Sequence, residues 1–221
     1  VRSCLPSPQC LHYRNKIEVP FRRLGSRSAF GFYRFESHDI VPFDRCFVHC
    51  EEGDKIFSAV RRIVLESGVH AYQESLHNKS LRHLLIKTAV NAKQALAVLI
   101  SNGHELKRLR EVSDRIMACH PIMKGVVQNI NQEVTNVILG NKTVVLRGSD
   151  HIVEQMEGLK FNITASSFFQ INPFQLPALM REVSSAAGLT GKERVLDAYS
   201  GVGLFSLSLA SKAAEIVGVE S

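Results

Sequence analysis

The sequence has little of what marks a membrane-bound or secreted protein. None of its apolar runs approaches the roughly 20 residues that a bilayer-spanning helix needs. Its first residues, VRSCLPSPQC, lack the long apolar core of a secretory signal. No repeat or low-complexity linker interrupts residues 12–165. We therefore expect a globular, cytoplasmic protein that does not associate with membranes.

Cysteine is also scarce, and its spacing is irregular. The chain has five cysteines: Cys4, Cys10, Cys46, Cys50 and Cys119. An odd number without a regular spacing is poor material for a disulfide framework and favours a reducing compartment. Cys46 and Cys50 lie close to His38 and His49, but no second Cys/His pair follows at zinc-finger distance. By composition alone, Cys46 is best interpreted as a buried structural residue.

Acidic residues are fewer than basic ones. The 221 residues, enough for one large domain or two small ones, carry a net charge of +6. Residues 1–50 contain eight Lys/Arg and four Asp/Glu, so they hold +4 of that charge. A basic patch is typical of a protein with a polyanionic partner. A surface that is merely basic would have the same composition, so charge alone leaves both interpretations open.

The first two thirds of the chain predict an α+β domain. Alternating apolar residues from Ile17 to Phe21 and from 30 to 35 indicate two strands that pair across Gly25 and Ser26. The remaining expected elements are a helix capped by Asp54 and ending at Gly68, strands from Leu81 and from Ala95, a helix over Asn102–Ala118, and a hairpin of VILGNKTVVL that turns at Gly140 and Asn141. Arg14 and Lys16 stand just before the first strand; taken alone, they are best interpreted as solvated charges.

A helix is expected after the aromatic pair Phe168 and Phe169. Asn172 is a suitable cap, Pro173 suits the first helical position, and Gly188 ends the apolar pattern. Two exposed aromatic rings could stack on a nucleobase, whereas two buried rings would plug a domain junction. The pattern alone favours the plug.

The stretch VLDAYSGVGLFSLSLA predicts a strand, a glycine turn and a helix. An apolar strand ends in Asp197, the turn contains Gly201 and Gly203, and a second apolar run ends in Glu220. This arrangement is typical of a nucleotide pocket, in which an acid after the next strand holds ribose hydroxyls. Ser206 stands where a dinucleotide fingerprint needs its third glycine, and Asp197 would repel a pyrophosphate. The pattern therefore favours S-adenosylmethionine, although a tight turn in any α/β protein is the simpler alternative.

Several of these segments together resemble the uracil-5 RNA methyltransferase family. The segments are SFFQIN, VLDAYSGVGLFSLSLA and IVGVE, preceded in the same order by YRNKIE and GFYRFESHDIVPFDRC. Members of this family transfer a methyl group from S-adenosylmethionine to carbon 5 of a uridine in ribosomal or transfer RNA. The resemblance covers nearly the whole chain. It implies a central α+β RNA-binding domain, residues 1–165, followed by the first part of a Rossmann-like, doubly wound methyltransferase domain, residues 166–221.

The resemblance also assigns roles to residues. With Asp197 from the pattern above, the expected cofactor-binding residues are Gln170, Asp197, Tyr199, Gly201, Gly203 and Glu220. The expected RNA-binding residues are Arg14, Lys16 and Phe168. Many members hold a 4Fe-4S cluster on three closely spaced cysteines and a distant fourth, and Cys46 matches the fourth. The other three have no counterpart, because Cys4 and Cys10 lack their spacing.

The family's catalytic groups have no counterpart either. Its nucleophilic cysteine and its base lie beyond the position of Ser221, and Cys119 is in the wrong domain to replace the nucleophile. The family's cysteine in the glycine turn is Ser200 here, and Leu204 replaces a residue that is polar in some members. We therefore expect a segment of a longer enzyme, trimmed at both ends, that is inactive by itself and exposes apolar faces on its last two strands.

As partners we expect RNA, with ribosomal RNA favoured over transfer RNA, and a monomeric assembly. Two alternatives remain open at this stage. One is a non-catalytic RNA-binding module, and the other is a methyltransferase that acts on a small molecule or a protein.

Overall fold

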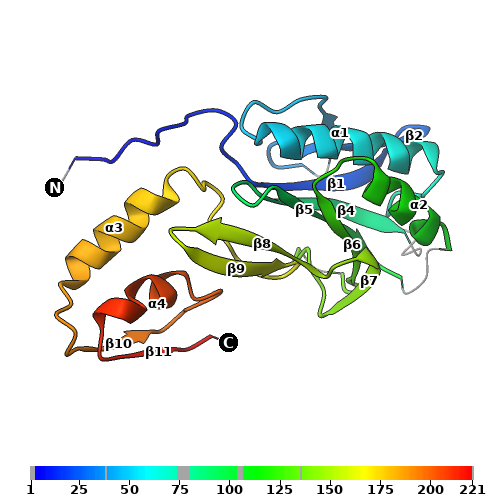
Figure 1. Ribbon diagram of the computed structural model, residues 1–221. Helices are drawn as coiled ribbons and strands as arrows, with labels where there is room; N and C mark the ends of the chain where they lie inside the picture. The colour runs from blue at the N-terminus through cyan, green and yellow to red at the C-terminus, as the bar shows by residue number, and fades with distance from the viewer. Residues whose placement is uncertain (1–2, 38, 74–79, 104–106, 135, 221) are drawn as a thin grey trace.

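The structure of the protein is a computed structural model that describes residues 3–37, 39–73, 80–103, 107–134 and 136–220. A large mixed sheet with two helices forms one end of the molecule, and a smaller α/β unit that contains the C-terminus forms the other (Figure 1). The hairpin β8–β9 lies between them. In the part of the chain that the structure covers, no helix is both long and apolar enough to cross a membrane.

The elements follow one another in a simple order. They are β1 (Lys16–Leu24), β2 (Arg27–Tyr33), β3 (Ile40–Pro42), α1 (Glu51–Glu66), β4 (Leu81–Ala89), β5 (Gln94–Ser101), α2 (Lys107–Ala118), β6 (Met123–Ile130), β7 (Lys142–Gly148), β8 (His151–Met156), β9 (Leu159–Thr164), α3 (Leu176–Ala187), β10 (Arg194–Asp197), α4 (Leu204–Leu209), a short 3₁₀ turn (Ala210–Lys212) and β11 (Glu215–Gly218).

The main sheet has seven strands in the order β3-β2-β1-β4-β5-β6-β7. All neighbours pair antiparallel except β5 and β6, which are parallel because α2 connects them. The pair β1–β2 confirms the expected hairpin, since Leu24 lies opposite Arg27 across the turn at Gly25 and Ser26. Gly25 has a φ of 60°, which this tight turn requires.

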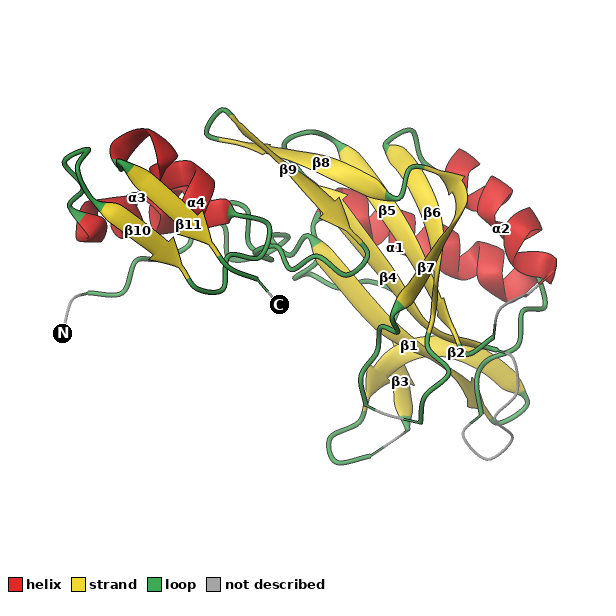
Figure 2. Ribbon diagram, turned by 90° about the horizontal axis from the view of Figure 1, so that it is seen from below, coloured by secondary structure: helices red, strands yellow, loops and turns green. Residues whose placement is uncertain are grey.

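Both faces of the sheet's centre are buried. Every residue of β4 is buried, as expected for strands rich in Leu and Ile that are covered on two sides. Helices α1 and α2 pack on one face, through an apolar cluster that includes Phe57, Val112 and Leu84. A second cluster on the other face joins Leu85 of β4 to the β8–β9 hairpin and continues into α3 and α4. Figure 2 shows the helices and the β8–β9 hairpin on either side of these strands.

Two of the expected helices begin at other residues. Helix α1 starts at Glu51 rather than after Asp54, because Cys50 is the N-cap residue. Asp54 lies inside the first turn, where its carboxylate accepts a hydrogen bond of 3.3 Å from the Cys46 N–H. Helix α3 starts at Leu176, since the Asn172 side chain instead closes the preceding turn by accepting the N–H groups of residues 174 and 175. For α2, the expected start at 102 is too early: it begins at Lys107, and residues 104–106 lie outside the described residues.

The expected hairpin around Gly140 is wrong in one of its arms. Strand β7 pairs with β6, and residues 137–139 are not a strand. The amide of Asn131 donates to the carbonyls of Val137 and Ile138, so this segment is held as a loop. Asn129 similarly binds the main chain of Gly140 on both sides. The apolar residues 137–139 have the composition of a strand, but Asn131 binds their carbonyls and β7 pairs with β6 instead.

In the C-terminal unit, α4 packs against β11 of the two-stranded parallel sheet β10–β11, and α3 packs against α4 (Figure 1). Its strands expose apolar side chains, as expected: Leu196 is 66% exposed and Val217 is 43% exposed. Leu176 and Met180 of α3 and Leu204 of α4 are buried in the second apolar cluster, together with residues of the main sheet. The smaller unit is therefore packed onto the larger one rather than joined to it by a bare linker.

Candidate functional site

The glycine turn after β10 is closed by main-chain hydrogen bonds. The Ser200 N–H donates to the Val219 carbonyl (3.1 Å), and the Gly203 N–H donates to the Ser200 carbonyl (2.7 Å). Gly201 and Gly203 have φ values of 54° and 79°, in the left-handed region that favours glycine. A side chain at Gly201 would meet open space, so conformation rather than crowding calls for glycine there. The chain thus leaves an open turn between β10 and α4.

Glu220 lies at this turn, although it is 19 residues away from Gly201 in the chain. Its Oε2 accepts a hydrogen bond of 2.8 Å from the Gly201 N–H. Because β10 and β11 are parallel, both strands end at the same edge of the sheet, and the acid after the second meets the turn after the first. The carboxylate is exposed, so it can also accept hydrogen bonds from a ligand.

Asp197 is engaged inside the turn. Its Oδ2 accepts hydrogen bonds from the Ser206 hydroxyl (2.6 Å) and the Ser206 N–H (3.2 Å). A carboxylate near the first turn of a helix, here α4, is stabilised by the unsatisfied N–H groups and by the helix dipole. Ser206, which replaces the third glycine of a dinucleotide fingerprint, therefore holds the acid before the turn in place.

The turn offers groups that suit S-adenosylmethionine. Tyr199 is 91% exposed and presents an aromatic ring beside the turn. A carboxylate suits two adjacent ribose hydroxyls, and an aromatic ring suits an adenine or an apolar chain. Among the predicted residues, Asp197, Tyr199, Gly201 and Gly203 lie on one stretch of chain, and the parallel pairing of β10 and β11 brings Glu220 to the same turn.

Gln170 is held by Asn15, just before β1, and not by the glycine turn. Its main-chain carbonyl accepts a hydrogen bond of 3.0 Å from the Asn15 amide, and the Asn15 N–H donates to the Ile171 carbonyl. Its recorded contacts are thus with the start of β1. In the residues that the structure covers, no recorded contact joins Gln170 to the turn at Gly201.

The three residues predicted to bind RNA meet in one cavity. Arg14, Lys16 and Phe168 all line a pocket of about 290 Å³ between the start of β1, the end of β4 and the loop 165–171. Phe168 is 70% exposed, whereas Phe169 is 8% exposed and packs against Phe161 with ring centroids 5.7 Å apart. The expected plug is therefore correct for Phe169 and wrong for Phe168, because the two neighbouring side chains point to different sides of the loop.

Lys87 is a third cation of this pocket, and the sequence analysis did not identify it. It is only 7% exposed, and its Nζ donates hydrogen bonds of 2.7 Å to the carbonyls of Thr164 and Ser167. Burial, together with the neighbouring Lys16 charge, lowers the pKa of Lys87 to about 8. Lys87 thereby fixes the loop that carries Phe168. The available signal was a lysine inside the apolar run LLIKTAV, where an unpaired charge would be costly.

The cysteines do not fit an iron–sulfur cluster. Cys46 is half-buried, and its N–H is bound to Asp54. No group of three or more His, Cys, Asp or Glu that could hold a metal was found in the residues described here. Only one of the four expected cluster ligands therefore has a counterpart. Burial raises the pKa of the Cys50 and Cys119 thiols, which is opposite to what a nucleophilic thiolate needs.

Known proteins of similar sequence are RNA methyltransferases. An uncharacterized RNA methyltransferase of Halalkalibacterium halodurans is 39% identical over 220 residues, which is 100% of this chain and 48% of the relative. One from Clostridium acetobutylicum is 38% identical over 208 residues, which is 94% of this chain and 45% of the relative. The chain thus spans about half the length of the curated relatives it matches. No family model matches it.

The fold has a counterpart among solved structures. It is similar to that of the Pyrococcus abyssi tRNA (uracil-54, C5)-methyltransferase in complex with S-adenosyl-L-homocysteine, with a TM-score of 0.77 and 22% sequence identity. The match covers 98% of this chain and 50% of that protein. This likeness confirms a mixed α/β fold of the kind expected from the sequence.

Proposed function

Because known proteins 38% and 39% identical along nearly the whole chain are RNA methyltransferases, we propose that it binds RNA and S-adenosylmethionine for the transfer of a methyl group to an RNA base. Residues 1–165 form the RNA-binding part in this proposal, and residues 166–221 begin the cofactor-binding part. The observation that carries it is the meeting of Arg14, Lys16 and Phe168 in one pocket, beside a loop that leads into the unit with the glycine turn.

The cofactor-binding part is assigned to the turn after β10. When bound, S-adenosylmethionine supplies an electrophilic methyl group on its sulfonium. Glu220 would accept hydrogen bonds from the ribose, and Tyr199 would lie against the nucleoside. Ser206 keeps Asp197 at the head of the turn through its two hydrogen bonds. Gln170 would approach from the loop that Asn15 holds.

The RNA-binding part is assigned to the pocket beside β1. Arg14 and Lys16 would contact phosphate groups, since charged contacts to the backbone supply most of the sequence-independent affinity for nucleic acid. The exposed ring of Phe168 would stack on an unpaired base, which is how proteins commonly hold single-stranded RNA. Lys87 supports this arrangement, because it holds two carbonyls of the loop that presents Phe168.

We further propose that the whole enzyme methylates carbon 5 of a uridine, in ribosomal rather than transfer RNA. Carbon 5 becomes nucleophilic when a thiolate adds to carbon 6 of the ring, and a base must later remove the carbon-5 proton. The raised pKa values of the Cys50 and Cys119 thiols do not suit either of them for this step. The proposal therefore assigns the nucleophile and the base to the rest of the enzyme.

Calorimetry tests the cofactor assignment. S-adenosylmethionine and a nicotinamide dinucleotide would be titrated into the protein and into Glu220→Ala. We expect the protein to bind S-adenosylmethionine in preference, and the substitution to weaken binding by about 10-fold or more, the usual worth of a hydrogen bond to a charged group. Preference for the dinucleotide would overturn the assignment. Glu215→Ala, at the opposite end of β11, the strand that Glu220 follows, is the matched control, and it should bind as the parent does.

The position of the methyl group is tested with RNA that carries tritium at carbon 5 of uridine. Methylation of that carbon by the whole enzyme must release tritium to water. Methyl incorporation without tritium release would show that another atom is modified, and would reject the uridine-5 proposal while leaving RNA methylation intact.

A non-catalytic RNA-binding role is the second candidate. It is favoured by the position of the pocket, whose lining includes residues 14–16, 87–88 and 165–169 but no residue of the glycine turn. In this case RNA would bind with full affinity to the Glu220→Ala variant, and S-adenosylmethionine would not bind to the parent protein. Binding of both ligands by the parent rejects this candidate.

A further inference from the structure

One face of β1 is turned away from helices α1 and α2. Ile17, Val19 and Phe21 belong to the apolar cluster under the helices. Since side chains of a strand alternate between faces, Lys16 and Arg22 lie on the opposite face. Arg22 is roughly 20 Å further along β1 than Lys16, at about 3.3 Å per residue. In Figure 2, β1 runs from the junction of the two units toward the far end of the sheet.

The guanidinium of Arg22 is fixed in place. Its Nη1 donates to the carbonyls of Phe21 (3.1 Å) and Arg82 (3.0 Å), and its Nη2 donates to the hydroxyl of Tyr33 (2.6 Å). It also lies 5.7 Å from the ring centroids of both Tyr33 and Tyr72. A guanidinium held by two carbonyls, a hydroxyl and two rings has little freedom left, so it is ready to receive a ligand without reorganisation.

The charge around Arg22 is positive. Every contact recorded for Arg22 in the described part of the chain goes to an uncharged group. A second guanidinium, that of Arg82, lies 5.0 Å from the Tyr72 ring on which Arg22 also stacks. Half-buried charges are normally compensated by an opposite charge. An anion is therefore the ligand that this place favours.

Tyr33 adds an exposed aromatic surface to this charge. It lies at the end of β2, and 41% of its surface is accessible although its hydroxyl is bound to Arg22. A ring beside a fixed guanidinium offers stacking for a base and a charge-assisted hydrogen bond for a phosphate. An acidic peptide would use the charge but not the exposed aromatic surface, so the combination favours a nucleotide.

We propose that Arg22 and Tyr33 form a second RNA subsite on the open face of β1 and β2, where a base stacks on Tyr33 and a phosphate pairs with Arg22. The RNA strand held in the pocket at Arg14, Lys16 and Phe168 continues along β1 to reach it. This inference rests on the proposed RNA-binding function and extends it from one nucleotide pocket to a path along the sheet.

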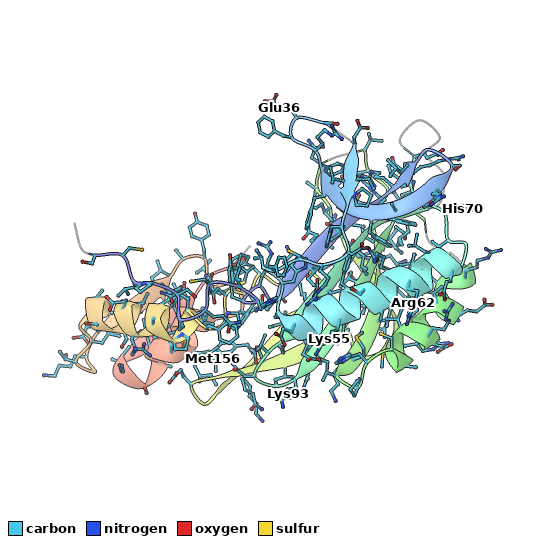
Figure 3. All side chains as sticks on the ribbon, turned by 90° about the horizontal axis from the view of Figure 1, so that it is seen from above. Glu36, Lys55, Arg62, His70, Lys93 and Met156 are labelled. Carbon is cyan, nitrogen blue, oxygen red and sulfur yellow. The ribbon has the colours of Figure 1, made fainter. Side chains whose placement is uncertain are left out.

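The test measures binding of a fluorescent single-stranded RNA of about 15 nucleotides by anisotropy, over a range of salt concentrations. Arg22→Gln should reduce the slope of log K against log salt by about 0.7, the value for one phosphate contact on a single strand. Tyr33→Ala should weaken binding by about 5- to 150-fold, the range for one base–aromatic stack, with little change in slope. Arg62→Gln is the matched control, because it removes the same charge from exposed α1, on the other side of the sheet (Figure 3).

The outcomes separate this subsite from the proposed function. If Arg14→Ala with Lys16→Ala lowers affinity and slope while Arg22→Gln and Tyr33→Ala behave as Arg62→Gln does, the second subsite is wrong and the first pocket stands. If the parent protein does not bind RNA, both proposals fail. Because Arg22 is half-buried, Arg22→Gln is compared with Arg22→Lys, which keeps the charge. Arg22→Lys should retain the salt slope of the parent protein. If Arg22→Lys loses as much slope as Arg22→Gln does, the phosphate contact is rejected.

Discussion

Acid should destabilise this protein through His83, a residue of β4 that is 5% exposed. Burial and the charges of Arg22 and Arg82 lower the pKa of His83 from 6.5 to about 3. The unfolded chain takes up a proton below pH 6.5 and the folded chain does not, so stability is full above pH 6.5 and falls as the pH drops toward 3. At pH 5, which is 1.5 units below 6.5, the loss is about 2 kcal/mol, at 1.36 kcal/mol per pH unit.

The substitution His83→Leu isolates this effect. Urea unfolding of the parent and the variant at pH 7.5 and pH 5 gives four free energies of unfolding. Other titrating groups contribute equally to both proteins, so the loss between the two pH values should be about 2 kcal/mol smaller in the variant. His70→Gln, an exposed histidine (Figure 3), should leave the loss unchanged. Equal acid losses in the parent and His83→Leu would refute the reasoning, because they would mean that His83 is protonated in the folded state.

Three further substitutions test the packing that supports the site. Lys87→Met keeps the volume but leaves two loop carbonyls without a donor, so it should cost about 2 kcal/mol in urea unfolding and weaken RNA binding; unchanged RNA affinity would contradict its role in holding the loop. Glu154→Gln replaces a buried carboxylate that accepts hydrogen bonds from the N–H groups of residues 90–92. It should lower the free energy of unfolding by about 2 kcal/mol; an unchanged free energy would show that Glu154 does not hold the turn at residues 90–92. Gly125→Ala would place a methyl group 1.8 Å from the Ser149 carbonyl oxygen, so it should lower the free energy of unfolding by more than about 1 kcal/mol in thermal unfolding. A smaller loss of stability would show that this main chain can move aside.

The elements that could be predicted from the sequence are those with a strong local signal. Alternating apolar residues on β1 and β2, joined by Gly25, predict a hairpin because the period of a strand and the conformation of a two-residue turn are both local properties. The glycine turn after β10 was predictable for the same reason. The start of α1 was not, because by residue type Asp54 is a better cap than Cys50, yet the helix begins at Glu51 with Cys50 as its N-cap residue.

Part of the candidate site could also be predicted from the sequence. Asp197, Gly201 and Gly203 lie on one short stretch, so their proximity follows from chain connectivity. Glu220 could be placed because a strand–helix–strand unit brings both strand ends to the same edge. Phe168 and Phe169 could not be separated, since adjacent residues of a loop have no fixed period. Only the second apolar cluster shows which ring is buried.

The sequence by itself determined the resemblance to RNA methyltransferases, the glycine turn and the strand pattern, because each depends on residues that are neighbours in the chain or on short motifs. Tertiary structure alone decided that Arg14, Lys87 and Phe168 share a pocket, since these residues come from the segment before β1, from β4 and from a later loop. It also decided that Arg22 is held between Tyr33 and Tyr72. The physical reason is that burial and charge depend on which distant segments pack together, and no local pattern records that choice.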